Sequence, residues 1–226
     1  MHPKKQPRKL TEAEFRRVFK EVRDDINELQ LHDGILTGVM ENLERYPKLS
    51  DNFPGFFAAL LSAMRTDLII RLGRIYDPEG TGHASCTLVR CLRLMSESRE
   101  FFTDAAIQAR LSEGYRKTYP DYLALHRPDE KQLAEHIDQI EGSRERLINL
   151  RHKVYAHKDI ATVLSGNRSD FLHTHDEVKQ LIQQAHDIWN FYSRIWNAST
   201  WSDQSTMNAD DYQRLFEYLR RGMGIQ

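Results

Sequence analysis

The chain of 226 residues carries 32 basic and 33 acidic side chains, for a formal net charge of −1, and 40% of its residues are hydrophobic. This balance excludes the chain-wide positive field that is typical of non-specific nucleic-acid binders, so any nucleic acid would have to bind a local patch. The hydrophobic content is sufficient for one substantial core, alone or with a helical appendage.

The first nine residues, 1–9, are basic and contain two prolines but no apolar stretch. We expect a flexible tail rather than a secretion signal, with a basic arm that contacts RNA as the alternative. No apolar run approaches the roughly 18 residues that a membrane span needs. The two cysteines, Cys86 and Cys91, lie in one expected helix and point apart, which disfavours a disulfide and fits a reducing compartment. The sequence therefore predicts a cytoplasmic protein without membrane contact.

A first helix is indicated from Thr11 onward. Thr11-Glu-Ala-Glu14 is a capping box, in which each side chain satisfies a backbone N–H at the other end, and apolar residues then recur at helical spacing. Asp33-Gly34 is a candidate interruption of this helix, and Pro47 is expected to end it.

A second helix is indicated from Pro54, where proline in the first turn costs no hydrogen bond, to about Ile75. Asn52 is its candidate cap, and the turn sequence Asp77-Pro-Glu-Gly80 follows it. The first half of this helix is apolar on nearly every side, which predicts a central position in the bundle.

The rest of the chain also carries helical patterns. They cover about 85–95, 98–118, 129–159 with a candidate break at Gly142, a helix opened by the capping box Thr174-His-Asp-Glu177, and about 209–221. No alternating run of β-branched residues indicates a strand. We therefore predict an all-α helical bundle, in which the tail 1–9 precedes a single domain, 10–226. The last helix, 209–221, either belongs to this domain or is appended to it.

One segment combines residue types that suit chemistry, from Leu147 to Asp159 (Leu-Ile-Asn-Leu-Arg-His-Lys-Val-Tyr-Ala-His-Lys-Asp). On a helix, Arg151 and His157 lie on opposite sides of Val154 and flank the apolar stripe. A charged guanidinium beside a core stripe is costly unless it is paired. This position favours a cleft or a subunit interface, with a buried ion pair or a hydrogen-bonded core histidine as the alternative.

Histidine and arginine together suit RNA cleavage without a metal ion. An imidazole has an ordinary pKa near 6.5 and can take a proton from a ribose 2′-hydroxyl at neutral pH. A guanidinium holds a phosphate with a planar fork of donors and stabilises the negative charge that grows in the transition state. The 2′-oxygen would attack the adjacent phosphorus and leave a 2′,3′-cyclic phosphate.

The string from Leu150 to Asp159 resembles the Arg-x(4–6)-His signature of the HEPN superfamily (higher eukaryotes and prokaryotes nucleotide-binding). More narrowly, it is similar to the abortive-infection U-type, AbiU2-like branch, in which Leu-Arg-polar-Lys-x-x-Ala-His-basic-Asp is usual. The upstream segment 63–77 and Thr87-Leu88 also resemble that branch, so the similarity covers roughly residues 10–200. Two other matches to the bare spacing start at Arg168, in a Gly/Asn/Ser loop, and lack the surrounding string.

The resemblance implies a HEPN-like helical bundle, here with additional helices, that dimerises with its two signatures facing each other. Many members are metal-independent ribonucleases of toxin–antitoxin or phage-defence systems, and others bind nucleotides or partners without catalysis. Where the branch regulated by nucleotidyltransferase antitoxins has a tyrosine two residues after the signature histidine, this chain has Asp159. Tyrosine adenylylation at that position is therefore not expected.

These observations lead to a hypothesis for the site. Arg151 is expected to clamp the phosphate and His157 to act as general acid or base. Supporting positions, each with an ordinary surface or salt-bridged role as the alternative, are His152, Lys153, Tyr155, Asp67, Arg71 and Arg74. Trp189, Trp196 and Trp201 either stack bases or, as we expect, pack in the core or an interface.

The sequence thus predicts a metal-independent endoribonuclease, of the toxin or phage-defence kind, that acts as a homodimer on RNA. No cofactor or metal site is expected, because no glycine-rich phosphate loop, His-Glu-x-x-His or Cys-x-x-Cys motif is found. An antitoxin or another defence-system component is the expected protein partner. The alternative is a non-catalytic HEPN-like module that binds a nucleotide, RNA or a partner protein.

Overall fold

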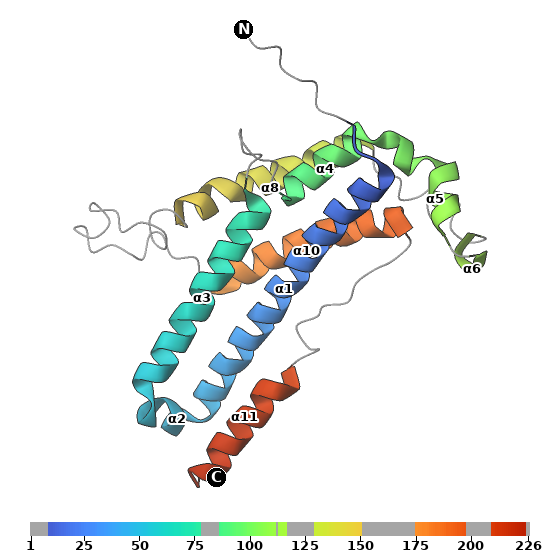
Figure 1. The fold of residues 1–226 in the computed structure, drawn as a ribbon. Coiled ribbons are helices and arrows are strands. Elements are labelled where there is room, and N and C mark those ends of the chain that lie inside the picture. The colour runs from blue at the N-terminus through green and yellow to red at the C-terminus, as the bar shows by residue number, and fades with distance from the viewer. Residues whose placement is uncertain are drawn as a thin grey trace.

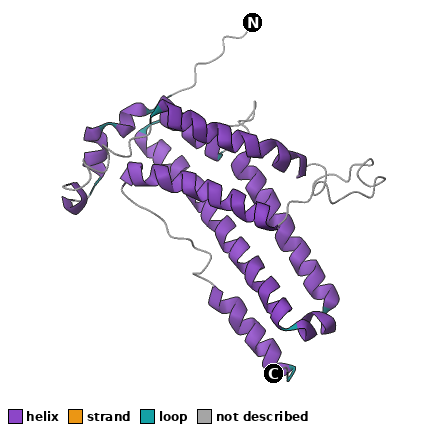
Figure 2. Ribbon diagram, turned by 180° about the vertical axis from the view of Figure 1, so that it is seen from behind, coloured by secondary structure: helices purple, strands orange, loops and turns teal. Residues whose placement is uncertain are grey.

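The computed structural model describes residues 9–77, 86–111, 113–116, 129–150, 175–197 and 209–224. Within these ranges every regular element is a helix and none is a strand, which confirms the predicted all-α fold (Figure 2). The helices are α1 (Glu12–Arg45), α2 (Pro47–Asn52), α3 (Pro54–Tyr76), α4 (Leu88–Glu97), the 3₁₀ helix η1 (Arg99–Phe102), α5 (Asp104–Arg110), α6 (Glu113–Arg116), α8 (Glu130–Leu150), α10 (His175–Asn197) and α11 (Ala209–Gly222). None of these helices is long and apolar enough to cross a membrane.

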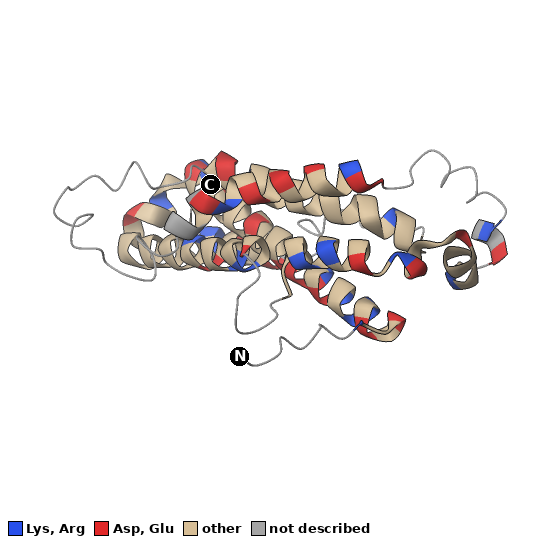
Figure 3. Cartoon of the chain, turned by 90° about the horizontal axis from the view of Figure 1, so that it is seen from above, with Lys and Arg blue, Asp and Glu red and all other residues tan. Residues whose placement is uncertain are grey.

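The long helices α1 and α3 form an antiparallel hairpin that is closed by the short helix α2 (Figure 1). At the open end of this hairpin, α8 and α4 lie side by side, and α8 packs against both α3 and α4. Helix α10 packs on α1, and α11 lies beside α1 near the closed end of the hairpin. Acidic and basic residues are both spread over several of the described helices in the view of Figure 3.

Helix α1 begins as predicted. The Thr11 side chain accepts a hydrogen bond from the Glu14 backbone N–H at 3.3 Å, and Glu14 Oε2 accepts one from the Thr11 N–H at 2.8 Å. The predicted interruption at Asp33-Gly34 is wrong, because α1 runs unbroken to Arg45. A glycine inside a helix costs only about 1 kcal/mol relative to alanine. The buried residues Leu29 and Leu36 on either side outweigh that cost by packing in the core.

The junction between α1 and α3 also differs from the sequence expectation. Helix α1 ends at Arg45, just before Pro47, as predicted, but Pro47 also occupies the first position of a further helix, α2. Asn52 does not cap α3, because its side-chain amide donates to the Lys48 carbonyl at 2.7 Å, within α2. Phe53 is the residue before α3, and Pro54 takes the first turn as predicted.

Helix α3 is central in the bundle, as predicted, but through its second half and not through its apolar first half. Phe56 in this half is 62% exposed, and the core residues of the second half include Leu68, Leu72 and Ile75. An apolar sequence allows a helix to be buried on any side. The number of helices that pack around it decides how much of its surface is buried. The second half of α3 packs in the main core with α1, α4, α8 and α10, whereas the first half packs only in the smaller cluster with α1, α2 and α11 among the described residues.

The segment 98–118 was expected to be one helix but is divided into η1, α5 and α6. Thr103 breaks it, because its hydroxyl accepts from the Ala106 N–H at 3.3 Å and so caps α5. Helix α4 begins later than expected, at Leu88, where the Thr87 hydroxyl accepts from the Arg90 N–H at 3.1 Å. Cys86 therefore precedes the helix that was expected to contain it.

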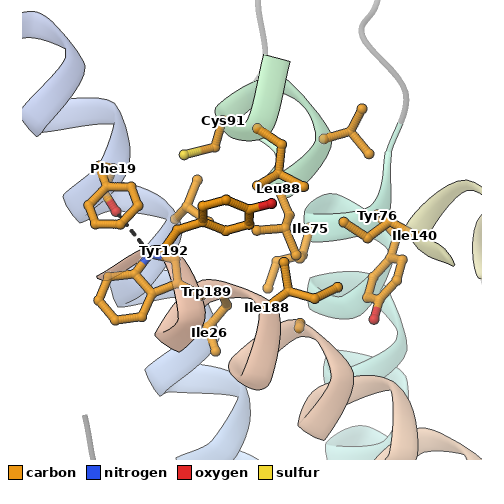
Figure 4. Packing of buried hydrophobic residues seen from close by; sticks show 14 of the residues in the cluster. Phe19, Ile26, Ile75, Tyr76, Leu88, Cys91, Ile140, Ile188, Trp189 and Tyr192 are labelled. Atoms are coloured by element: carbon orange, nitrogen blue, oxygen red, sulfur yellow. Dashed lines mark hydrogen bonds between the residues drawn. The ribbon is translucent and has the colours of Figure 1, made fainter. Parts of the chain in front are cut away.

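The main core lies between α1, α3, α4, α8 and α10 (Figure 4). Trp189 and Trp196 on α10 are each 3% exposed, in agreement with a packing role. The Trp189 indole N–H donates to the Phe19 carbonyl at 3.4 Å, and the Trp196 ring centroid lies 4.9 Å from that of Phe15. Trp201 lies outside the described residues.

A second, smaller apolar cluster attaches α11. Phe216 stacks on Phe57 with ring centroids 6.0 Å apart, beside the buried Val39 and Leu49. Next to them, the Tyr212 ring lies so close to Gly38 of α1 that a Cβ at this glycine would overlap it. The absence of a side chain at Gly38 therefore lets α11 pack directly on the α1 backbone.

Candidate functional site

The predicted catalytic segment follows α8 directly. Arg151, His152, Lys153, Tyr155 and His157 lie outside the described residues, so their geometry is not part of the description. The structure describes α8, which ends at Leu150, directly before Arg151, and the helices against which α8 packs.

Helix α8 packs against α3 and α4, with core contacts from Leu133 to Leu147. It runs through Gly142 without the predicted break. Ile140 and Leu147 are fully buried in the main core, and Arg93 of α4 donates to Glu141 at 2.9 Å. Leu147 is the first residue of the apolar stripe that Arg151 and His157 flank in the sequence. At Leu147, this stripe packs against the core of the same chain.

A histidine on α8 links this helix to α10. His136 Nδ1 lies 2.9 Å from the Tyr192 hydroxyl, and the two rings meet edge-to-face with centroids 5.5 Å apart. Burial lowers the pKa of His136 and raises that of the Tyr192 hydroxyl. Both side chains are therefore neutral at pH 7, as a partly buried hydrogen-bonded pair should be.

The predicted supporting residues Asp67 and Arg71 are brought together on α3 and face α1. Arg71 Nε donates to Asp67 Oδ2 at 2.8 Å, and the same carboxylate oxygen lies 2.6 Å from His32 Nδ1. Arg71 also forms an ion pair with Glu28 of α1. The third member, Arg74, lies one turn further along and approaches Asp25 of α1 at 3.8 Å.

The electrostatics of this cluster follow from partial burial and from the charges in it. Burial acts to lower the pKa of Arg71, but the hydrogen bonds and attraction from Asp67 and Glu28 outweigh it and raise the pKa. Burial raises the pKa of Asp25 against the attraction of Arg74. The Arg71 guanidinium is thus held by two carboxylates, which leaves it poorly placed to clamp a phosphate.

Sequence reasoning identified the α3 half of this cluster but missed the α1 half. Asp25, Glu28 and His32 recur at three- and four-residue spacing and share one face of α1, as Asp67, Arg71 and Arg74 do on α3. The complementary charges of these two sets of residues are the signal that could have predicted their contact. That prediction also requires the register of α1 against α3, which the sequence alone does not supply.

No group of three or more His, Cys, Asp or Glu side chains is arranged for a metal ion within the described part of the chain. The two clusters described above consist of hydrogen bonds and ion pairs. The residues expected to do chemistry on RNA follow α8 in the sequence.

A protein-family model confirms the resemblance seen in the signature string. The HEPN model described as AbiU2 matches residues 8–215, which is most of the chain. The chain belongs to the AbiU2 family of HEPN proteins. No curated protein and no solved structure gives a significant match. The family match includes the segment 151–159 and ends within α11.

The α1–α3 ion-pair cluster leads to a first prediction. Arg71→Ala should lower the free energy of unfolding by at most about 1 kcal/mol, because its partners are partly exposed and water screens them. Any RNA cleavage should stay close to the wild-type rate, because this guanidinium already binds two carboxylates. Urea unfolding and RNA cleavage assays of the same preparation measure both effects.

Glu28→Ala is the matched variant on the opposite helix. It should cost a similar free energy, and the double variant should cost less than the sum of the two single variants. A large loss of cleavage in Arg71→Ala with unchanged stability would instead make Arg71 part of the catalytic machinery.

Proposed function

We propose that this AbiU2-family protein is a metal-independent endoribonuclease of the toxin or phage-defence kind. Arg151 clamps the scissile phosphate and His157 transfers the proton. The observation that carries the proposal is the complete signature string, from Leu150 to Asp159, inside a matched family model. The anchored position of α8 supports it, because a catalytic segment needs a rigid element to place it.

In the proposed reaction, His157 takes the proton of a ribose 2′-hydroxyl. The 2′-oxygen attacks the adjacent phosphorus, and the bond from phosphorus to the 5′-oxygen of the next nucleotide breaks. That oxygen takes a proton from solvent as it leaves, His157 returns its proton to solvent, and the 5′ product ends in a 2′,3′-cyclic phosphate. Arg151 donates to the non-bridging phosphate oxygens, where negative charge grows in the transition state.

The proposal includes a homodimer in which the segment 143–158 of each copy lies at or near the interface. A twofold interface would place two copies of Arg151 and His157 beside one groove and would double a modest local basic patch. Such doubling suits a chain whose net charge is −1. An antitoxin or another defence-system protein would hold this activity in check in the cytoplasm until it is needed.

The proposed function is tested by incubating the purified protein in EDTA with mixed single-stranded RNA. Cleavage should persist, products should carry cyclic phosphate ends, and strands with 2′-deoxyribose should stay intact because the nucleophile is missing. Light scattering at micromolar concentration should report a dimer.

Cleavage that requires a divalent metal, or cleavage of the 2′-deoxy strand, would contradict the proposed chemistry. Binding of RNA or nucleotide without cleavage, across many RNAs, would favour the non-catalytic module instead.

A further inference from the structure

An open cleft is lined by residues from the C-terminal end of α1 and from helix α11. These two stretches lie at the end of the fold away from α8 (Figure 1). Its volume is about 810 Å³, which lies in the range of small-molecule sites. It is lined by Glu41, Asn42, Arg45, Tyr46, Tyr212, Gln213, Arg214, Glu217 and Arg220. This lining is polar and charged, which disfavours an apolar ligand.

The walls of the cleft are fixed by packing. The buried Phe216 holds α11 against Phe57, and the Tyr212 ring lies directly on the α1 backbone at Gly38. Tyr46, at the end of α1, is half-buried and packs on the same apolar cluster. Two of the lining residues, Tyr46 and Tyr212, are therefore held in place by packing against the rest of the protein.

Two guanidinium groups converge on one of these rings. Arg45 Cζ lies 5.4 Å from the centroid of the Tyr46 ring, and Arg220 Cζ lies 6.0 Å from it. Attraction between a cation and the face of an aromatic ring holds an arginine in place without neutralising its charge. Two chain segments far apart in the sequence thus present arginine donors to the same small volume.

The charges of the lining leave an excess of positive charge. Three arginines face two glutamates, and Glu217 is engaged outside the lining by Arg221 at 3.1 Å. Arg214 approaches Asp211 at 3.9 Å, while Arg45 has no carboxylate within ion-pair distance in the described part of the chain. Glu41 remains as an acceptor for a hydroxyl or amine of a ligand.

We propose that this cleft binds a phosphate-bearing anion through Arg45, with the Arg220 guanidinium on the opposite wall adding positive charge near the same ring. Guanidinium forks match the oxygens of a phosphate, and two of them within reach of one ring suit a ligand with more than one phosphate. Such a ligand is either a free polyphosphate or nucleotide, or a strand of nucleic acid with successive phosphates. The site does not include the signature segment, because its lining comes from the end of α1 and from α11, and two of its residues, Glu217 and Arg220, lie beyond the family match.

Arg45→Ala and the matched variant Lys48→Ala test this site. Both remove one positive charge from an exposed side chain near the end of α1, but Lys48 is not part of the lining. The probes are inorganic tripolyphosphate, followed by calorimetry, and a labelled 2′-deoxy oligouridylate, followed by fluorescence anisotropy in EDTA. We expect Arg45→Ala to weaken binding of at least one probe by about tenfold or more, as loss of a charged hydrogen bond does. Lys48→Ala should leave the affinity nearly unchanged.

The two probes distinguish the source of the phosphate. Arg45-dependent binding of tripolyphosphate supports a free anion, and Arg45-dependent binding of the oligouridylate alone supports a strand. Equal effects of the two variants would show that the probes bind to general surface charge and not to the cleft, which would overturn the proposal. A wild-type protein that binds neither probe would overturn it too. Because neither probe can be cleaved by 2′-hydroxyl attack, the result stands apart from the success or failure of the proposed ribonuclease activity.

Discussion

Replacement of His157 by alanine is expected to lower the rate of RNA cleavage about 10²–10⁴-fold, which is the usual contribution of one positioned acid–base group. The variant loses the group that accepts the 2′-hydroxyl proton, whereas binding of the phosphate by Arg151 is retained. Initial rates on single-stranded RNA in EDTA, with the wild type and the variant prepared side by side, measure the loss.

The matched control is His152→Ala, which removes an imidazole from the same string five residues earlier. It should lose much less activity if the position of the imidazole, and not its mere presence, matters. Circular dichroism and sizing of each variant are needed, because both histidines belong to a segment that follows a buried stretch of α8. Equal cleavage by the wild type and His157→Ala would mean that the activity comes from another site or a contaminant.

Arg151→Lys extends the same test to the phosphate clamp. Lysine keeps the charge but cannot reproduce the planar fork that binds two phosphate oxygens at once. We therefore expect most of the cleavage rate to be lost although the charge is conserved. A fully active Arg151→Lys enzyme would show that only a positive field is required at this position.

Elements with local signals could be predicted well. The capping box at Thr11 and the helical spacing after it located α1, and Pro54 located the start of α3. Their signals lie within one or two turns of the chain, so no tertiary knowledge was needed. The family of the chain was also recognisable, because the string after Leu150 is local.

Features that depend on tertiary contacts were predicted poorly. Gly34 does not interrupt α1 because packing on both sides supports the helix, and Asn52 bonds within α2, a short helix that the sequence did not indicate. The exposed first half of α3 looked central because composition does not tell which helices cover it. Prediction of the contact between Arg71 and Glu28 requires the register of α3 against α1, and the sequence of neither helix alone determines that register.

Arg110 is a further residue whose role only the tertiary structure reveals, and its removal should have a large effect on stability. Its side chain is 7% exposed and donates to Glu12 at 3.1 Å, to the Trp196 carbonyl at 3.1 Å and to the Phe101 carbonyl at 2.6 Å. The guanidinium also lies 3.9 Å from the Trp196 ring centroid. It thereby joins α5, the start of α1 and the end of α10, where the last carbonyls of a helix need donors.

We expect Arg110→Ala to lower the free energy of unfolding by about 2–3 kcal/mol, because the Trp196 and Phe101 carbonyls lose their charged donor, whereas the Glu12 carboxylate is 39% exposed and can bind water instead. Arg16→Ala is the matched control. Arg16 approaches the same Glu12 carboxylate at 3.7 Å, but its side chain is 62% exposed, so its loss should cost at most about 1 kcal/mol. Urea unfolding followed by circular dichroism measures both free energies. Similar small losses in the two variants would show that water replaces the Arg110 contacts and that this cluster does not hold α5 and α10 on α1.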